Sequence, residues 1–132
     1  MKVPWKRGDS YDMGYTFDEK SGRYLRSMPW GKHVLANGTR VATDNVLVIL
    51  ATQKYSKIYR GPGGVEPVHG LINDKGRFFY AHGGTFVTGT WSKGAIDALF
   101  TFTLDDGSPL AMAPGQTYVE LARTGAKVRI TG

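Results

Sequence analysis

The stretch TDNVLVILAT, residues 43–52, is the only long and nearly unbroken apolar run in the chain. Its middle, residues 46–50, consists of β-branched or bulky side chains, and the run is too short to favour a helix. A short run of this kind is typical of a strand that is buried on both faces. Asp44 and Asn45 mark its start, because short polar side chains favour turns and strand ends. We therefore predict a central strand here, with the other elements arranged around it.

The sequence before this strand predicts a β-hairpin. Residues 11–17 and 23–28 alternate between apolar and polar side chains, and a short loop that contains Gly22 joins them. Two alternating runs joined in this way are a hairpin signal. Residues 1–10 are polar and basic, and we interpret them as a lead-in arm that Trp5 docks onto the domain.

The sequence after the central strand predicts a second hairpin. Its turn is Gly83 and Gly84, because tight turns between strands require positive φ, which glycine adopts readily. The returning strand is residues 85–91, in which Phe86 and Val87 compete for the core-facing side.

The remaining pattern predicts a mainly β fold. Residues 53–64 end in Gly-Pro-Gly-Gly and are predicted to be irregular, whereas residues 65–72 contain Pro67 and suit an edge strand. No segment keeps helical spacing beyond a turn or two. Short runs separated by Gly and Pro turns indicate a sandwich or a barrel-like sheet of antiparallel or mixed strands, with little helix. We treat residues 1–132 as a single domain.

Composition excludes several classes of site. The chain of 132 residues is long enough to bury a core without cross-links, and it contains no Cys. Disulfides, Cys–metal sites and Cys nucleophiles are therefore excluded. No apolar run approaches the roughly 18 residues of a transmembrane helix. The first ten residues lack the apolar segment of a signal peptide, so the protein is either cytosolic or lacks a segment that was removed.

The positive charge is concentrated in the first half of the chain. The protein has 17 Lys and Arg against 11 Asp and Glu, a net charge of +6. Residues 1–60 carry this whole excess, and residues 61–132 are balanced. A basic face favours a polyanionic neighbour such as nucleic acid, anionic lipid or wall polymer. The alternative is an ordinary soluble surface, since acidic residues are interspersed with the basic ones.

Four motifs occur in an order that we associate with one family. They are SGRYLRSMPWGKHV at 21–34, TDNVLV at 43–48, GTWSK at 89–93 and DDGSPLAMAPGQTYVEL at 105–121. Together they span most of the chain, and the last block is the most specific. In these motifs the sequence resembles the C-terminal domain of the YerB family of Gram-positive lipoproteins, a domain of unknown function.

The resemblance implies a location and a domain context more than a reaction. Members of the family are secreted and membrane-anchored, with a signal peptide, a lipidated Cys and a separate N-terminal domain. This sequence has none of the three, so we expect it to be the C-terminal domain of a longer lipoprotein. Tyr118 stands where the family usually has Trp. Gly94 and Ala95 replace a more polar pair, which weakens a functional interpretation of Lys93.

Catalytic and metal-binding patterns are absent from the sequence. His33, His69 and His82 are not at metal-ligand spacing, and no GxSxG motif accompanies the serines. Glu120 alternates with apolar neighbours and is expected to face solvent. We therefore predict no catalytic residue, no metal site and no cofactor.

The best candidates for a polar binding site are Arg26, Asp44, Asn45 and Trp91. Asp44 and Asn45 stand at a strand end, where polar groups commonly face a cleft, and Arg26 lies in the matching RYLRSM stretch. The alternative is that Arg26 and Asp44 form a structural ion pair that ties the first hairpin to the central strand. Trp91 is likewise more often a core residue than a ligand platform.

Two tyrosines complete the set of candidate residues. Tyr55 and Tyr59 flank basic residues, a thin version of the aromatic and basic surface that binds single-stranded nucleic acid.

Three functional hypotheses follow. The first is a non-enzymatic extracytoplasmic module that binds a cell-envelope component, a protein partner or its own N-terminal domain, with membrane attachment only through a lipid anchor outside this chain. The second is an enzyme that hydrolyses wall polymer, which requires Asp44, Arg26 and a histidine within hydrogen-bond reach. The third is a nucleic-acid-binding domain, which requires the lead-in arm of residues 1–10 and residues 55–60 to form one basic face.

Overall fold

The protein folds into two packed β-sheets without a helix in the described residues. The computed structural model describes residues 1–5, 11–61 and 64–131, and only the backbone of residues 56–59 and 66. The first sheet has the order β1-β2-β3-β4, with β5 also paired to β3, and these strands are Lys2–Pro4, Asp12–Asp18, Arg23–Met28, Gly31–Lys32 and Ala42–Thr43. All of its pairings are antiparallel. The prediction of a mainly β single domain is confirmed.

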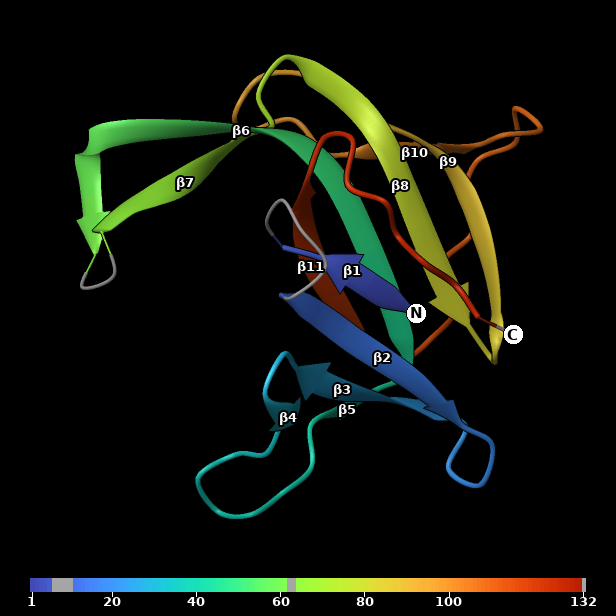
Figure 1. Ribbon diagram of the computed structural model, residues 1–132. Helices are drawn as coiled ribbons and strands as arrows, with labels where there is room; N and C mark the ends of the chain where they lie inside the picture. Colours follow the sequence, from blue (N-terminus) through green and yellow to red (C-terminus); the bar gives the residue numbers. More distant parts are fainter. Residues whose placement is uncertain (6–10, 62–63, 132) are drawn as a thin grey trace.

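The second sheet is built around the predicted central strand. Its order is β10-β9-β8-β6-β11, and these strands are Thr101–Leu104, Thr85–Lys93, Asp74–His82, Asn45–Gly61 and Thr117–Arg123. β6 pairs antiparallel with β8 and parallel with β11, so the sheet is mixed. β10 and β11 lie at its two edges, and the sheet does not close into a barrel. Figure 1 shows it curving around one side of the molecule.

The first part of β6, residues 46–51, is buried on both faces, as its sequence predicts. Val46, Val48 and Leu50 pack with residues of the first sheet, in a core that also contains Tyr15 and Tyr24. The alternate residues Leu47, Ile49 and Ala51 pack into a second core, with Phe78, Tyr80 and Trp91. None of the six residues from Val46 to Ala51 is more than 7% exposed. Because each buried aliphatic side chain contributes about 1.5–3 kcal/mol, this one strand holds both layers together.

β6 extends well beyond the predicted strand, so the expectation of an irregular segment at 53–64 is wrong for residues 53–61 and 64, while residues 62–63 lie outside the described residues. β6 continues to Gly61 and pairs with β7, Gly64–Gly70, with a register shift between Tyr55 and Arg60. This hairpin projects from the body of the molecule as an arm (Figure 1). None of the described side chains of this arm beyond Ala51 is buried, so they show no alternation of buried and exposed residues that a sequence pattern would reveal. The prediction that Pro67 marks an edge strand is confirmed.

The two predicted hairpins are present, with two corrections. β2 and β3 form the first hairpin, and β8 and β9 form the second around Gly83 and Gly84, whose φ angles are 56° and 79°. Phe86 and Val87 do not reach the core, since they are 49% and 40% exposed. The lead-in arm is partly a strand: β1 pairs with β2 and buries Val3. Residues 6–10 of that arm lie outside the described residues.

Candidate functional site

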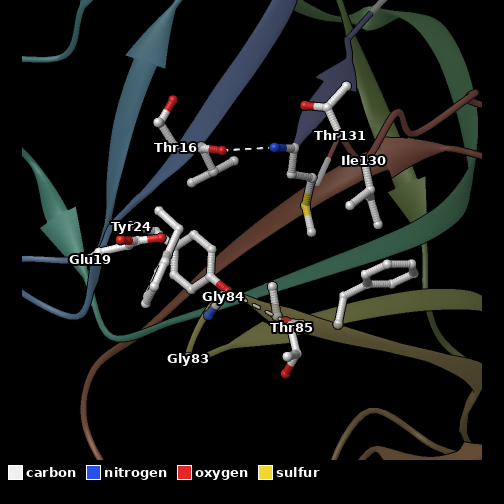
Figure 2. Close-up of a pocket in the computed structure, with 13 residues that line it drawn as sticks. Thr16, Glu19, Tyr24, Gly83, Gly84, Thr85, Ile130 and Thr131 are labelled. Atoms are coloured by element: carbon white, nitrogen blue, oxygen red, sulfur yellow. Dashed lines mark hydrogen bonds between the residues drawn. The ribbon is translucent and has the colours of Figure 1, made fainter.

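A surface cavity of about 510 Å³ opens between the two sheets (Figure 2). Its walls come from the β2–β3 hairpin, the β8–β9 turn and the two ends of the chain. The lining residues are Met1, Tyr15, Thr16, Phe17, Glu19, Tyr24, Ala81, Gly83, Gly84, Thr85, Phe86, Ile130 and Thr131. Aromatic rings, threonine hydroxyls and one carboxylate therefore surround the same space.

Tyr24 fixes the two hairpins that form this cavity. Its hydroxyl accepts a hydrogen bond from the Gly84 amide at 3.1 Å and donates one to the Thr85 carbonyl at 3.4 Å. Burial raises the pKa of the Tyr24 hydroxyl above its ordinary value, which favours the protonated form that donates to Thr85. The Phe17 ring packs beside Tyr24 and also against Gly84, where a Cβ atom would lie only 3.0 Å from the ring. A side chain at position 84 would therefore disturb the wall of the cavity.

A second hollow adjoins the first along β9. It measures about 230 Å³ and is lined mainly by apolar residues, from Tyr80 and His82 to Leu110 and Ala111. Thr85 and Phe86 belong to both hollows. Phe86 is thus a half-exposed aromatic ring on the wall between two adjoining hollows.

The amino-acid pattern does not reveal this surface. The pattern predicts the Gly83–Gly84 turn but makes Phe86 a competitor for the core-facing side. The closeness of the turn to Phe86 was the available signal, because side chains beside a tight turn lie at the end of a sheet. Residues 16–19, 80–87 and 109–111 meet there only after folding.

Arg26, the first candidate from the sequence, is buried in an internal network. Its Nη2 lies 3.2 Å from Glu120 Oε2, its Nε donates to the Tyr15 hydroxyl at 3.1 Å, and its Nη1 donates to His33 Nδ1 at 2.8 Å. The Arg26 Cζ atom also lies 4.7 Å from the ring centroid of Tyr118. The expectation that Glu120 faces solvent is wrong, since it is 6% exposed.

The network favours a neutral Tyr15 beside a charged pair. The Tyr15 hydroxyl donates to Glu120 in a short hydrogen bond. Burial, then the neighbouring Glu120 carboxylate, raises the pKa of Tyr15 well above its ordinary value. Burial alone would lower the pKa of Arg26, but the contacts with Tyr15 and Glu120 outweigh it and raise it. Every polar group named here has a partner inside the protein, so the network acts to join the sheets.

Asp44 pairs with Arg23 and not with Arg26. Arg23 Nε lies 3.2 Å from Asp44 Oδ1, and both side chains are about one-third exposed. The expected ion pair between the first hairpin and the start of the central strand therefore exists, but another arginine of the hairpin makes it. Asp44 Oδ2 also accepts the Gln116 amide at 2.8 Å.

Asn45 is fully buried and holds the segment before β11. Its Nδ2 donates to the Ala113 carbonyl at 3.1 Å, and its Oδ1 accepts from His82 Nδ1 at 2.7 Å. Neighbouring Thr43 donates to the Gln116 carbonyl at 2.8 Å. The TDN and PGQT motifs thus bind each other, which accounts for these residue types without a ligand.

Of the other three candidates, Trp91 is in the core and Tyr55 and Tyr59 belong to the β6–β7 arm. Trp91 is fully buried, and its Nε1 donates to the Leu50 carbonyl at 2.9 Å. Tyr55 is 63% exposed on the β6–β7 arm. Tyr59 lies in the same strand, and its side chain is outside the described residues. The candidates therefore do not form one site, and a role for any of them in ligand binding stays a prediction.

The residue groupings that the hydrolase and the nucleic-acid-binding hypotheses require are only partly present in the described residues. Arg26 and His33 come within hydrogen-bond reach, but Asp44 is engaged by Arg23 and Gln116. The basic face of the nucleic-acid hypothesis depends on residues 6–10 and 56–59, whose side chains lie outside the described residues. Within the described part of the chain, no group of three or more His, Asp or Glu side chains is placed to hold a metal ion. That part also contains no helix long and apolar enough to cross a membrane.

Comparisons with known proteins agree with the fold. The crystal structure of the YerB protein from Bacillus subtilis is similar, with a TM-score of 0.70 and 19% identity over 92% of this chain. The chain covers 39% of that protein, and at this identity the likeness shows the fold alone. No curated protein matches the sequence. A family described as the C-terminal domain of a protein of unknown function, DUF3048, matches residues 1–119. The resemblance to a YerB-like C-terminal domain is thus confirmed, and the chain belongs to the DUF3048 C-terminal domain family.

Proposed function

We propose that this domain is a non-enzymatic binding module that works outside the cytoplasm and takes its ligand in the cavity between the two sheets. The observation that carries the proposal is the position of Phe86. An aromatic ring that is 49% exposed, on the wall between hollows of about 510 and 230 Å³, is typical of a recognition surface. The proposed location rests on the resemblance to YerB lipoproteins.

The lining favours a ligand with both apolar faces and polar edges. Phe86, Phe17 and Tyr24 offer apolar contact, while Thr16, Thr85 and Glu19 offer hydroxyl and carboxylate groups. A cell-envelope polymer that combines sugar rings with polar substituents has this chemistry. The second possibility is a docking role, in which this surface receives the N-terminal domain that the resemblance implies.

Retention on purified insoluble peptidoglycan tests the envelope ligand. We expect the domain to be retained at low salt and at about 0.5 M salt, where surface charge is largely screened. Phe86→Ala should weaken retention about tenfold, because about half of a phenylalanine ring would lose its contact. Tyr55→Ala is the matched control, since Tyr55 is an exposed aromatic residue on the distant arm.

The outcomes separate the possibilities. Retention that is lost at high salt would mean that the +6 net charge acts generically and would contradict a specific site. Equal weakening by Phe86→Ala and Tyr55→Ala would place the contact outside the cavity. No retention at either salt concentration would reject the envelope ligand and leave the docking role, which binding to a separately produced N-terminal domain would test.

A further inference from the structure

The second hollow, of about 230 Å³, is lined by a tyrosine whose hydroxyl proton has no acceptor in the described part of the chain. This residue, Tyr80, is only 5% exposed. Its hydroxyl accepts a hydrogen bond from the Ala113 amide at 2.8 Å. Native proteins rarely leave a buried polar group without its partners, because the unpaired group costs free energy. The Tyr80 hydroxyl is therefore a donor that a ligand in this hollow can use.

His82 lines the same hollow and offers an acceptor. The Nδ2 atom of Asn45 lies 3.1 and 3.4 Å from the carbonyl oxygens of Ala113 and Pro114, so it is the donating end of that amide. Asn45 Oδ1 is then an acceptor, and His82 Nδ1, at 2.7 Å from it, must carry the hydrogen. A neutral imidazole with its hydrogen on Nδ1 has a lone pair on Nε2. The described residues supply no donor to that lone pair.

The donor and the acceptor share one face of the second sheet. Tyr80 and His82 are two positions apart on β8, and side chains two positions apart on a strand point to the same face. Across the ladder, Tyr80 pairs with Val87 and His82 pairs with Thr85. The Thr85 hydroxyl is already bound, since it donates to the His82 carbonyl at 3.0 Å. Tyr80 and His82 thus provide the two polar groups of this face that are open to a ligand.

The opposite wall of the hollow is apolar and fixed to the sheet. It contains Leu104, Pro109 and Leu110. The Leu104 amide donates to the Ser108 carbonyl at 2.8 Å, and the Leu110 amide donates to the Phe102 carbonyl at 2.9 Å. These bonds hold the segment of residues 108–110 against β10. A pocket formed before the ligand arrives spends less free energy on ordering during binding.

A secondary amide with a small apolar substituent matches this hollow. Its carbonyl oxygen can accept the Tyr80 proton, and its N–H can donate to His82 Nε2, so both of its polar groups find partners. A carboxylate has no hydrogen for His82, and an ammonium group has no acceptor for Tyr80. The methyl group of an acetamido substituent suits the apolar walls, which a bare hydroxyl group would leave without contact.

We propose that the second hollow binds the acetamido group of an N-acetylated amino sugar whose ring lies against Phe86. The inference rests on the proposed function, in which the adjoining cavity takes a polymer of sugar rings with polar substituents. Phe86 lines both hollows, so a sugar ring placed on it brings its substituents to the second hollow. Tyr80 and His82 then determine which substituent is accepted.

Binding of soluble oligosaccharides, followed by NMR titration of the domain, tests this assignment. The ligand is the β-1,4-linked tetramer of N-acetylglucosamine. The matched control is the β-1,4-linked tetramer of glucose, which has the same linkage and charge but a hydroxyl in place of each acetamido group. We expect the glucose tetramer to bind at least about tenfold more weakly, since it leaves Tyr80 and His82 without their partners. Equal affinities, or no binding of the N-acetylglucosamine tetramer, would overturn the proposal.

His82→Asn isolates the acceptor. The side-chain nitrogen of Asn can occupy the place of His Nδ1, so the variant keeps a donor for Asn45 and removes Nε2. We expect about tenfold weaker binding of the N-acetylglucosamine tetramer and an unchanged affinity for the glucose tetramer. His69→Asn is the control, because His69 is on the β6–β7 arm and lines neither hollow. Unchanged selectivity in His82→Asn would contradict the assignment.

Peptidoglycan separates a failure of this inference from a failure of the proposed function. Chemical de-N-acetylation should lower retention of the domain at about 0.5 M salt, where charge is largely screened, and re-N-acetylation should restore it. Retention that Phe86→Ala weakens but de-N-acetylation leaves unchanged would support the proposed function and reject the acetamido assignment. Selective binding of the N-acetylglucosamine tetramer without retention on peptidoglycan would support the assignment and reject that polymer as the ligand.

Discussion

Arg26 on β3 and Glu120 on β11 form an ion pair that joins the two sheets, with 3.2 Å between Nη2 and Oε2. Their side chains are only 6% and 7% exposed, and residues 94 positions apart in sequence meet there. Tyr15 contacts both members of the pair, as acceptor from Arg26 and donor to Glu120. If either Arg26 or Glu120 were replaced by a neutral residue, the charge of the other would stay buried without an opposite charge beside it. The stability contributed by each residue therefore depends on the presence of the other.

Glu120→Gln is expected to destabilise the domain strongly. Removing one member of a buried ion pair typically costs about 3–5 kcal/mol, because the remaining charge stays buried. Since Tyr15 and His33 still contact Arg26 in the variant, we expect about 3 kcal/mol, measured by urea unfolding. A double-mutant cycle tests the coupling. The double variant Arg26→Met/Glu120→Leu should lose at least about 1 kcal/mol less than the sum of the losses of Arg26→Met and Glu120→Leu made singly. Additive losses would show that the two residues are not coupled.

Asn45→Ala is expected to lower the free energy of unfolding by about 2 kcal/mol, because a fully buried amide loses several partners at once. Asn37→Ala is the control. Asn37 is exposed and accepts one hydrogen bond, from the Thr39 amide at 3.0 Å, so its loss should be below about 0.5 kcal/mol. Thermal or urea unfolding of the two variants gives the comparison. Similar losses would mean that Asn45 does not hold the segment before β11.

The buried part of the fold is predictable from sequence because burial leaves a pattern. Residues 46–50 are apolar on both faces, and β6 is indeed buried on both faces there. In the β6–β7 arm, no described side chain beyond Ala51 is buried, so residues 53–64 leave no strand pattern and were predicted as irregular, whereas Pro67 still marked the β7 half as an edge strand. The charged residues show the same limit, because motif and strand-end position identify Arg26 and Asp44 but not their partners. Glu120 pairs with Arg26, and Arg23 pairs with Asp44, only once the chain has folded, and no local pattern encodes these pairs. The cavity is likewise formed by turns distant in sequence.

Gly89→Ala is expected to destabilise the domain by about 3 kcal/mol or more through overpacking. A Cβ at this position would lie 2.1 Å from the Thr103 carbonyl oxygen and 2.6 Å from the Phe78 ring, so β9, β10 and the core would have to shift. Gly94→Ala is the control, because its Cβ would meet only Ala98, at an ordinary 3.6 Å. Equal stability of the two variants, measured by thermal unfolding, would contradict the close packing around Gly89. This packing explains the glycine of the GTWSK motif.

Tyr15 is expected to make the domain lose stability at alkaline pH. Burial, then the Glu120 carboxylate, raises the pKa of Tyr15 above its ordinary value of 10.0. The folded state therefore keeps the phenol proton at a pH where the unfolded state releases it. This contribution is fully present below pH 10.0 and is lost above it, by up to about 1.4 kcal/mol per pH unit.

The measurement is the free energy of unfolding of the wild type and of Tyr15→Phe from about pH 8 to about pH 11, on either side of the ordinary tyrosine pKa. Tyr15→Phe should be less stable at pH 8, because Glu120 and Arg26 lose a partner, but its stability should fall less steeply above pH 10.0. Burial raises the pKa of Tyr24 as well, so a residual alkaline slope is expected in the variant. Tyr55→Phe, at an exposed position, should keep the slope of the wild type. Parallel curves for Tyr15→Phe and the wild type would show that the Tyr15 phenol is not protected from ionisation by the folded state.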